Sequence, residues 1–283
     1  MINPLTKEQA FKLVDAISKN ETLALSASAF ENENGEWIFE ASCDHKPDLE
    51  KFNKIANEIL GGKVSFSAQK LDPKIDWVSK SLKDLKPVIA GGFYIRGNHD
   101  KSKIPSNLIE LKINAAQAFG TGHHETTTGC LEAIKEILEN KKPNAMLDIG
   151  TGTGVLAIAL AKLTKQKIIA SDIDQIAVKT TKDNAKLNKV AKIIHAIKAT
   201  GAKHKDITKN APYDLIVANI LAKPLEELAP EIKKIAAKNA TIILSGILTK
   251  QAANVIAAYE KQDIKLKKQL TKGEWATLTL EKS

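Results

Sequence analysis

Residues 146–154 read MLDIGTGTG, an apolar run that enters a loop with glycine at every second position. A helical pattern follows at once over residues 155–165, so the loop joins a strand to a helix. Glycine lets a backbone approach a ligand closely. In open α/β sheets ligands bind at the carboxyl ends of the strands, which is where this loop is expected. Asp148 stands two residues before Gly150, and the spacing is Gly-x-Gly-x-Gly. A dinucleotide pyrophosphate is fitted by Gly-x-Gly-x-x-Gly, so the stretch predicts a different nucleotide-type ligand.

Short apolar runs alternate with helical patterns on both sides of this loop, which predicts a buried parallel sheet covered by helices, a doubly wound α/β fold. The runs that we expect to be its strands are residues 146–149, 167–172, 192–197, 214–219 and 241–245. Asp172 ends the second of them, 22 residues after Gly150. A carboxylate at that place can hold both hydroxyls of a ribose.

The front of the chain has a different pattern. Thr6 to Gln9 form a capping box that opens a helix to about residue 19, and Asn34-Gly35 is a hairpin turn signal between strands at 22–29 and 36–42. A second helix over 48–60 and a third strand over 64–68 complete a small α+β layer, for which we expect a ferredoxin-like topology.

Asp72-Pro73 interrupts the pattern, and a short helix over 76–82 is expected before Pro87. We therefore expect a recognition domain over 1–72, a linker helix over 73–87 and a ligand-binding domain over 88–283. Strands are expected at 88–95 and 108–113, and a helix at 126–138.

Several segments resemble a known family. The glycine loop with Asp172 looks like the S-adenosylmethionine (SAM) site of class I methyltransferases, whose core is Rossmann-like. Residues 118–127 (AFGTGHHETT), 218–222 (ANILA) and 244–248 (LSGIL) resemble, in that order, the enzymes that methylate ribosomal protein L11. Residues 76–87 (DWVSKSLKDLKP) resemble that family's linker. The resemblance is strong from about residue 76 to residue 283 and only architectural before it.

The resemblance implies a SAM-dependent protein N-methyltransferase that modifies lysine side-chain or N-terminal amines of ribosomal protein L11, free or in the large subunit. It places the cofactor contacts at Thr127, Gly150, Asp172 and Asn219, and Asn219 is also the candidate catalytic residue. Thr127 near a helix start can meet the methionine carboxylate, and Asp172 the ribose. Asn219 ends the fourth strand of the fold, where its side-chain carbonyl can accept from an incoming amine. A strand-end cap is the alternative for Asn219.

The residues after Asn219 bear on the substrate. Methyltransferases that act on planar amides or base amines usually have Asn/Asp-Pro-Pro-Tyr/Phe here, with the aromatic ring stacked on the flat group. This chain continues Ile220-Leu221-Ala222, without prolines or an aromatic residue. A non-planar aliphatic amine is therefore the better fit.

His123-His124-Glu125 has the appearance of a metal motif. Adjacent side chains in a loop diverge, and no third histidine or cysteine follows at ligand spacing, so we expect no metal. A lid that closes over SAM, with Gly120 and Gly122 as its joints, is the favoured interpretation of residues 118–125.

Composition limits the remaining classes. The formal charge of +9 rests on 41 lysines and the single arginine Arg96, so we expect no specific nucleic-acid partner. The net charge is −3 over residues 1–75 and +12 over the rest. An acidic front suits a basic partner, although solvated surface charge explains this difference equally well.

No long apolar run or signal peptide is present, so we expect a cytoplasmic protein without membrane contact. An RNA methyltransferase and a non-catalytic SAM-binding or RNA-binding module stay open as alternatives.

Overall fold

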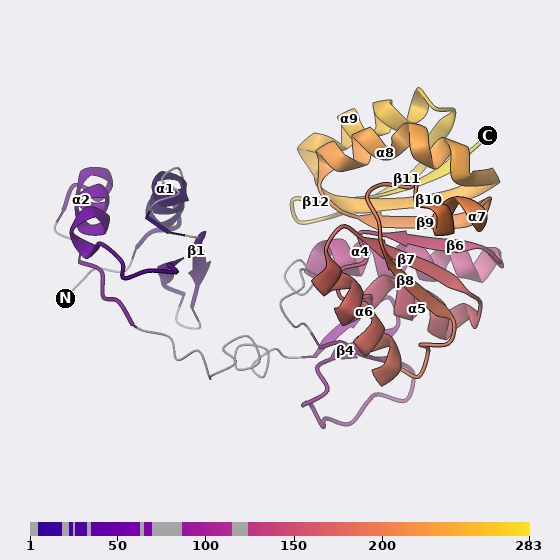
Figure 1. Ribbon diagram of the computed structural model, residues 1–283, viewed down its shortest axis with the longest axis horizontal. Coiled ribbons are helices and arrows are strands. Elements are labelled where there is room, and N and C mark those ends of the chain that lie inside the picture. The colour runs from indigo at the N-terminus through magenta and orange to yellow at the C-terminus, as the bar shows by residue number, and fades with distance from the viewer. Residues whose placement is uncertain are drawn as a thin grey trace. The chain divides into compact units, whose positions relative to one another are not determined.

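The computed structural model describes residues 5–18, 23–24, 26–32, 35–62, 65–69, 87–114 and 124–283. Backbone contacts divide the chain into two compact units, Met1–Ile75 and Asp76–Ser283 (Figure 1). The expected helix over 76–82 lies outside the described residues.

The described residues of the first unit form two helices and a hairpin: α1 (Lys7–Ser18), β1 (Ser26–Glu31), β2 (Trp37–Ser42) and α2 (Leu49–Leu60). The capping box that opens α1 is confirmed, since Thr6 and Gln9 each donate a backbone N–H to the other's side-chain oxygen. β1 and β2 pair antiparallel, and Gly35 in the turn between them has φ of 78°. α2 ends at Gly61, whose φ is 66°, as a left-handed cap.

The prediction of a third strand is wrong for the part of it that the structure describes. Residues 65–69 are in no strand. The N–H of Phe66 donates to Oδ1 of Asn53 on α2 at 2.7 Å, in place of a ladder partner. The ring of Phe66 packs edge-on against Phe39 and Phe52. The alternating apolar residues therefore reflect packing against α2 and β2.

The described part of the second unit starts with a three-stranded sheet of β3 (Val88–Ala90), β4 (Phe93–Arg96) and β5 (Ile109–Lys112), in that order. The single strand predicted over 88–95 is in fact the hairpin β3–β4. Gly91 and Gly92, with φ of 56° and 83°, make its turn. A Cβ on Gly91 would lie 2.7 Å from the carbonyl carbon of Leu131, so the turn needs glycine for space as well.

A seven-stranded sheet forms the centre of this unit, in the order β11-β12-β10-β9-β6-β7-β8. Its strands are β6 (Met146–Ile149), β7 (Ile168–Asp172), β8 (Ile194–Lys198), β9 (Tyr213–Asn219), β10 (Ala236–Leu248), β11 (Ile264–Lys272) and β12 (Trp275–Lys282). The helices are α4 (His124–Asn140), α5 (Val155–Thr164), α6 (Gln175–Leu187), α7 (Lys205–Lys209), α8 (Ala222–Ile235) and α9 (Thr249–Glu260).

Helices cover both faces of the sheet, with α4, α5 and α6 on one face and α8 and α9 on the other (Figure 1). Every residue of β6 is buried, and alternate residues of the strand enter different cores: Met146 packs with the α4–α5 cluster, Leu147 with the α8–α9 cluster. The doubly wound α/β fold predicted from the sequence is confirmed.

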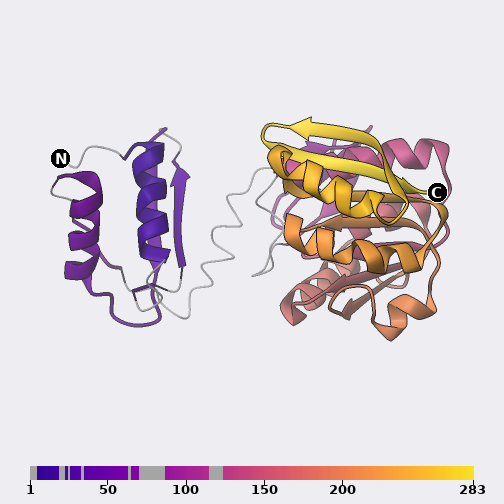
Figure 2. The ribbon, with the colours of Figure 1, turned by 90° about the horizontal axis from the view of Figure 1, so that it is seen from above.

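The sheet is mixed, however, and not purely parallel as expected. β12 runs antiparallel to β10 and to β11, and this hairpin forms one end of the sheet (yellow in Figure 2). The hairpin turns at Gly273, whose φ is 55°. In β11 charged side chains interrupt the apolar pattern, as is common on an edge strand, so this segment has no clear strand signal in the sequence.

Candidate functional site

The glycine loop, residues 150–154, leaves the carboxyl end of β6 and enters α5. All three of its glycines have positive φ, of 71°, 54° and 83° along the chain. The N–H groups of Gly150 and Thr151 both donate to the carbonyl of Ser171 on β7, at 2.8 and 2.9 Å. These two bonds tie the start of the loop to the neighbouring strand end.

Two of the glycines are also required by close neighbours. A Cβ on Gly150 would lie 2.2 Å from Cγ2 of Ile220, the residue after β9. A Cβ on Gly154 would lie 2.9 Å from Cγ2 of Thr181 on α6. The loop thus sits between the end of β9 and helix α6, where only glycine fits without displacement.

Asp148, the third residue of β6, holds the start of this loop and of α5 through hydrogen bonds. The side chain is 1% exposed, and its Oδ2 accepts from the Thr151 hydroxyl at 2.7 Å and from the Ala157 N–H at 3.2 Å. Its Oδ1 has no hydrogen-bond partner. Burial raises the pKa of the Asp148 carboxyl from 3.8 to about 6, against the opposing effect of those hydrogen bonds. The sequence placed an acid here but gave it no role.

Asp172 ends β7 beside the loop. Its Oδ2 accepts the N–H of Gly152 at 2.9 Å, and its Oδ1 accepts the N–H of Asp174 at 3.0 Å. The carboxylate is half-buried, and an ionised carboxylate has lone pairs beyond these two bonds. Ile173, next in the chain, is 66% exposed. A partly solvated acid and an apolar surface therefore lie side by side at the loop.

Asn219 ends β9 on the other side of the loop. β9 pairs parallel with β6, Ala218 opposite Ile149, so Asn219 is level with Gly150. The side chain is half-buried, and Asn219 is paired with Ser245 of β10. The structure thus brings Gly150, Asp172 and Asn219 to one edge of the sheet.

Thr127 lies in the first turn of α4, which begins at His124, two residues earlier than predicted. Its side chain is half-buried, and α4 packs against β9 and β10. Among the hydrogen bonds of the described residues, none joins Thr127 to the other three predicted contacts. Its role as a cofactor contact stays a prediction.

The predicted lid and the histidine pair fall largely outside the structure. Residues 115–123 and the side chain of His124 are not among those described. Within the described part of the chain, no cluster of three or more His, Cys, Asp or Glu residues could hold a metal ion. Likewise, no helix in this part combines the length and apolar character needed to cross a bilayer.

Comparison with known proteins gives the family. The family model "Ribosomal protein L11 methyltransferase (PrmA)" matches residues 9–283. The chain belongs to this family. A ribosomal protein L11 methyltransferase from Brucella abortus is 46% identical over 243 residues, 86% of this chain and 85% of that protein. One from Rhodopseudomonas palustris is 40% identical over 261 residues, 92% and 88% of the two chains.

A solved structure agrees with this membership. The ribosomal protein L11 methylase of Lactobacillus delbrueckii subsp. bulgaricus superposes with a TM-score of 0.62 at 27% identity, over 68% of this chain and 96% of that one. The predicted Rossmann-like methyltransferase fold, the methyltransferase activity and the SAM cofactor are thereby confirmed for this member of the L11 methyltransferase family. The chemistry of the site fits that cofactor, because the half-buried Asp172 carboxylate keeps accepting capacity beside the glycine loop after its two backbone hydrogen bonds.

Proposed function

We propose that this enzyme transfers methyl groups from SAM to aliphatic amines of ribosomal protein L11, on lysine side chains, the N-terminus or both. The observation that carries the proposal is Asn219, held level with Gly150 at the end of β9 and followed by Ile220-Leu221-Ala222. Leu221 is 73% exposed, so an apolar side chain, and no stacking ring, stands next to Asn219. An alkyl amine suits that surface better than a flat base or amide.

The cofactor contacts proposed are Thr127, Gly150, Asp172 and Asn219. Asp172 would accept from the ribose hydroxyls, while exposed Ile173 offers apolar surface to the adjacent base. Gly150 allows close backbone approach, and Thr127 in the first turn of α4 would receive the methionine carboxylate near the positive end of the helix.

Bound SAM supplies a methyl group that its sulfonium already activates. The protein's own contribution is then to position the amine and to keep it neutral. The side-chain carbonyl of Asn219 would accept one N–H of the amine and so direct its lone pair. Lysine has a reference pKa of about 10.4, so removal of water around the amine, aided by Leu221, favours the neutral form. Asp148 is no candidate base, because it lies buried beneath the loop and holds Thr151.

Residues 1–72 are proposed as the substrate-recognition domain, joined by a linker at 73–87 to the methyltransferase domain at 88–283. The net negative charge of residues 1–72 suits a basic partner. A ferredoxin-like topology for this unit is part of the proposal, supported by the order helix, hairpin, helix. We infer a cytoplasmic location from the proposed substrate, because ribosomal proteins are made and assembled where translation takes place.

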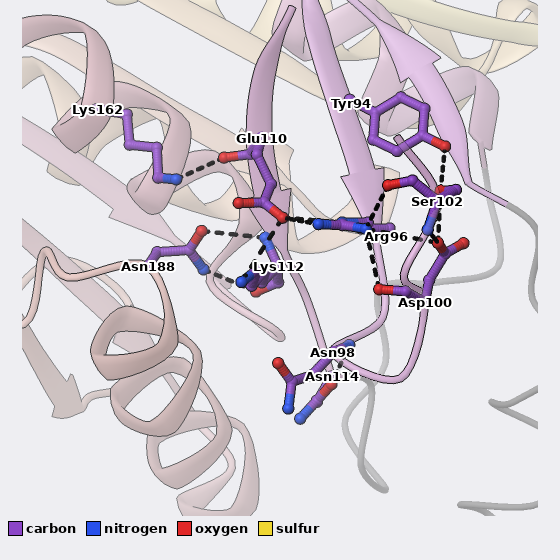
Figure 3. A network of polar contacts seen from close by, with 10 residues as sticks. All are labelled: Tyr94, Arg96, Asn98, Asp100, Ser102, Glu110, Lys112, Asn114, Lys162 and Asn188. Carbon is purple, nitrogen blue, oxygen red and sulfur yellow. Dashed lines mark hydrogen bonds and ion pairs between the residues drawn. The ribbon is translucent and has the colours of Figure 1, made fainter. Parts of the chain in front are cut away.

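The RNA methyltransferase alternative is disfavoured by Arg96, the chain's one arginine. Its side chain is 10% exposed and donates its hydrogen bonds to groups within the second unit (Figure 3). Nε donates to Glu110 at 2.8 Å, and Nη1 donates to the carbonyls of Asp100 and Ser102, both at 2.9 Å. The guanidinium, the group best suited to bind phosphate, is therefore already hydrogen-bonded within the protein. The non-catalytic alternative does not fit membership of a methyltransferase family.

Labelled SAM, incubated with the enzyme and L11 either free or in large subunits, tests the proposal. Label should enter L11, with no label in ribosomal RNA, and amino-acid analysis should recover methylated lysine or N-terminal residues. Label confined to RNA, or to glutamine side chains, would overturn it.

A further inference from the structure

Asn184 of α6 and Asn188, the C-cap residue of that helix, lie one turn apart and hydrogen-bond to the backbone at the end of β5 and just after it. Asn188 accepts the N–H of Lys112 at 3.0 Å and donates to its carbonyl at 2.7 Å (Figure 3). Asn184 makes the same pair of bonds with Asn114, both at 3.0 Å. The spacing of four on the helix matches the spacing of two on an extended backbone, so each side-chain amide acts as one unit of a neighbouring strand.

Asn184 has one contact that Asn188 lacks. Its Nδ2 also donates to the carbonyl of Thr153, in the glycine loop, at 2.8 Å. The second hydrogen of Asn188 Nδ2 goes instead to the carbonyl of Asn184, at 2.8 Å. Asn184 is 1% exposed and therefore links the strand to the loop within the protein interior.

Thr181, one turn before Asn184, holds the neighbouring peptide of the loop. Its hydroxyl donates to the carbonyl of Gly152 at 3.0 Å. Two consecutive carbonyls of the loop thus face α6. The C=O and the following N–H of a trans peptide point in opposite directions, so these bonds also orient the N–H groups of Thr153 and Gly154. The Gly154 N–H meets the carbonyl of Thr151 at 2.8 Å, which closes the loop on itself.

The other end of the Asn184 contact is itself fixed. Oδ1 of Asn114 accepts the N–H of Asn98, in the turn after β4, at 3.0 Å (Figure 3). Lys162 of α5 donates to the carbonyl of Glu110 on β5. The segment that Asn184 holds, just after β5, is therefore also bonded to Asn98, and β5 itself is bonded to α5. Through Asn184, the Thr153 peptide of the loop is connected to a segment with several anchoring contacts.

We propose that Asn184, assisted by Thr181, is a positioning residue for SAM. It touches no cofactor atom; it acts through the Thr153 carbonyl, which fixes the shape of the loop before the cofactor arrives. A loop that is already ordered loses less conformational entropy on binding, so more of the contact energy appears as affinity. The inference rests on the proposed cofactor site at this loop.

Titration calorimetry of SAM on the full chain tests it, with Asn188→Ala as the matched control. Both Asn184→Ala and Asn188→Ala remove two strand bonds, so both should lower the unfolding midpoint, but only Asn184→Ala frees the Thr153 carbonyl. We expect the Kd for SAM to rise about tenfold for Asn184→Ala, the size of one net hydrogen bond, and to change less than about twofold for Asn188→Ala. At saturating SAM, kcat of Asn184→Ala should fall less than the Kd rises.

Equal changes in Kd for Asn184→Ala and Asn188→Ala would overturn the inference and leave Asn184 with a structural role only. If Asn184→Ala does not fold, the Thr181 pair decides: Thr181→Ser keeps the hydroxyl and should bind SAM more tightly than Thr181→Val, and equal affinities refute the inference. Asp172→Ala in the same series separates a failure of the proposed cofactor site from a failure of the role proposed for Asn184. Unchanged affinity there refutes the site itself, whereas a loss there with no difference between the asparagine variants refutes only the role of Asn184.

Discussion

The backbone N–H of Gly152 donates to Oδ2 of Asp172 at 2.9 Å. This bond joins the glycine loop after β6 to the acid that ends β7, two features that the sequence gives 20 residues apart. The proposed ribose acceptor thus also supports the loop, so substitutions at Asp172 act on both.

Asp172→Ala should lose most of its SAM affinity while the chain stays folded. Each hydrogen bond from a ribose hydroxyl to this carboxylate contributes roughly 1.5–3 kcal/mol. The loss of each bond should therefore raise the Kd for SAM about tenfold or more. Titration calorimetry measures the loss. The matched control is Asp174→Ala, which removes the N-cap of α6, a 2.8 Å bond from the Ile176 N–H. It should lower stability by about 1 kcal/mol and leave SAM binding nearly intact. Wild-type affinity in Asp172→Ala would show that the ribose lies elsewhere.

Asn219→Ala should reduce kcat far more than SAM affinity, because its proposed main task is to orient the amine. Steady-state kinetics with L11 as substrate, beside SAM titration, separates the two effects. A variant with near-normal kcat would identify Asn219 as a strand-end cap only.

The buried Asp148 should make stability depend on pH in an unusual direction for an acid. Its pKa is about 6 in the folded protein against 3.8 ordinarily, so the folded state binds the proton more tightly. The free energy of unfolding from this group therefore falls as pH rises from about 4 to about 6, and the loss persists above that range. Asp148→Asn removes this titration.

Urea unfolding of wild type and Asp148→Asn across this range measures the difference. Between about pH 4 and about pH 7, wild type should lose up to about 3 kcal/mol relative to the variant. Parallel stability profiles would mean that the carboxyl titrates normally, for example because water reaches Oδ1.

A fragment that starts at Pro87 should bind SAM as the full chain does but fail to methylate L11. The glycine loop, Asp172 and Asn219 all lie in the second unit, whereas the acidic surface proposed for recognition lies in the first. SAM titration and label transfer are measured on the same preparation, so the binding serves as the folding control. Transfer to L11 at the full-length rate would leave the first unit without a role in recognition.

Local signals were sufficient for much of this protein. Glycine at 150, 152 and 154 permits the positive φ values that the loop adopts. The largely apolar runs of β6 and β9, which contain Asp148 and Asp214, follow from burial on both faces of the sheet. The capping box at Thr6 and the αL glycine at Gly61 set helix ends through contacts within one turn. These features depend on residues close in sequence, so the sequence alone determines them.

Contacts between distant segments needed the tertiary structure. The sequence cannot show that Phe66 packs on α2 without a strand partner, since its alternation is the same in both cases. It cannot show that β12 inserts antiparallel beside β10, or that Asn184 bonds residues 31 and 70 positions away. A single side-chain amide that takes the place of a neighbouring strand's peptide leaves no repeating pattern in the sequence. Only the packing of α6 against the loop gives that asparagine a task, which is why the sequence determined the loop and the fold determined what holds it.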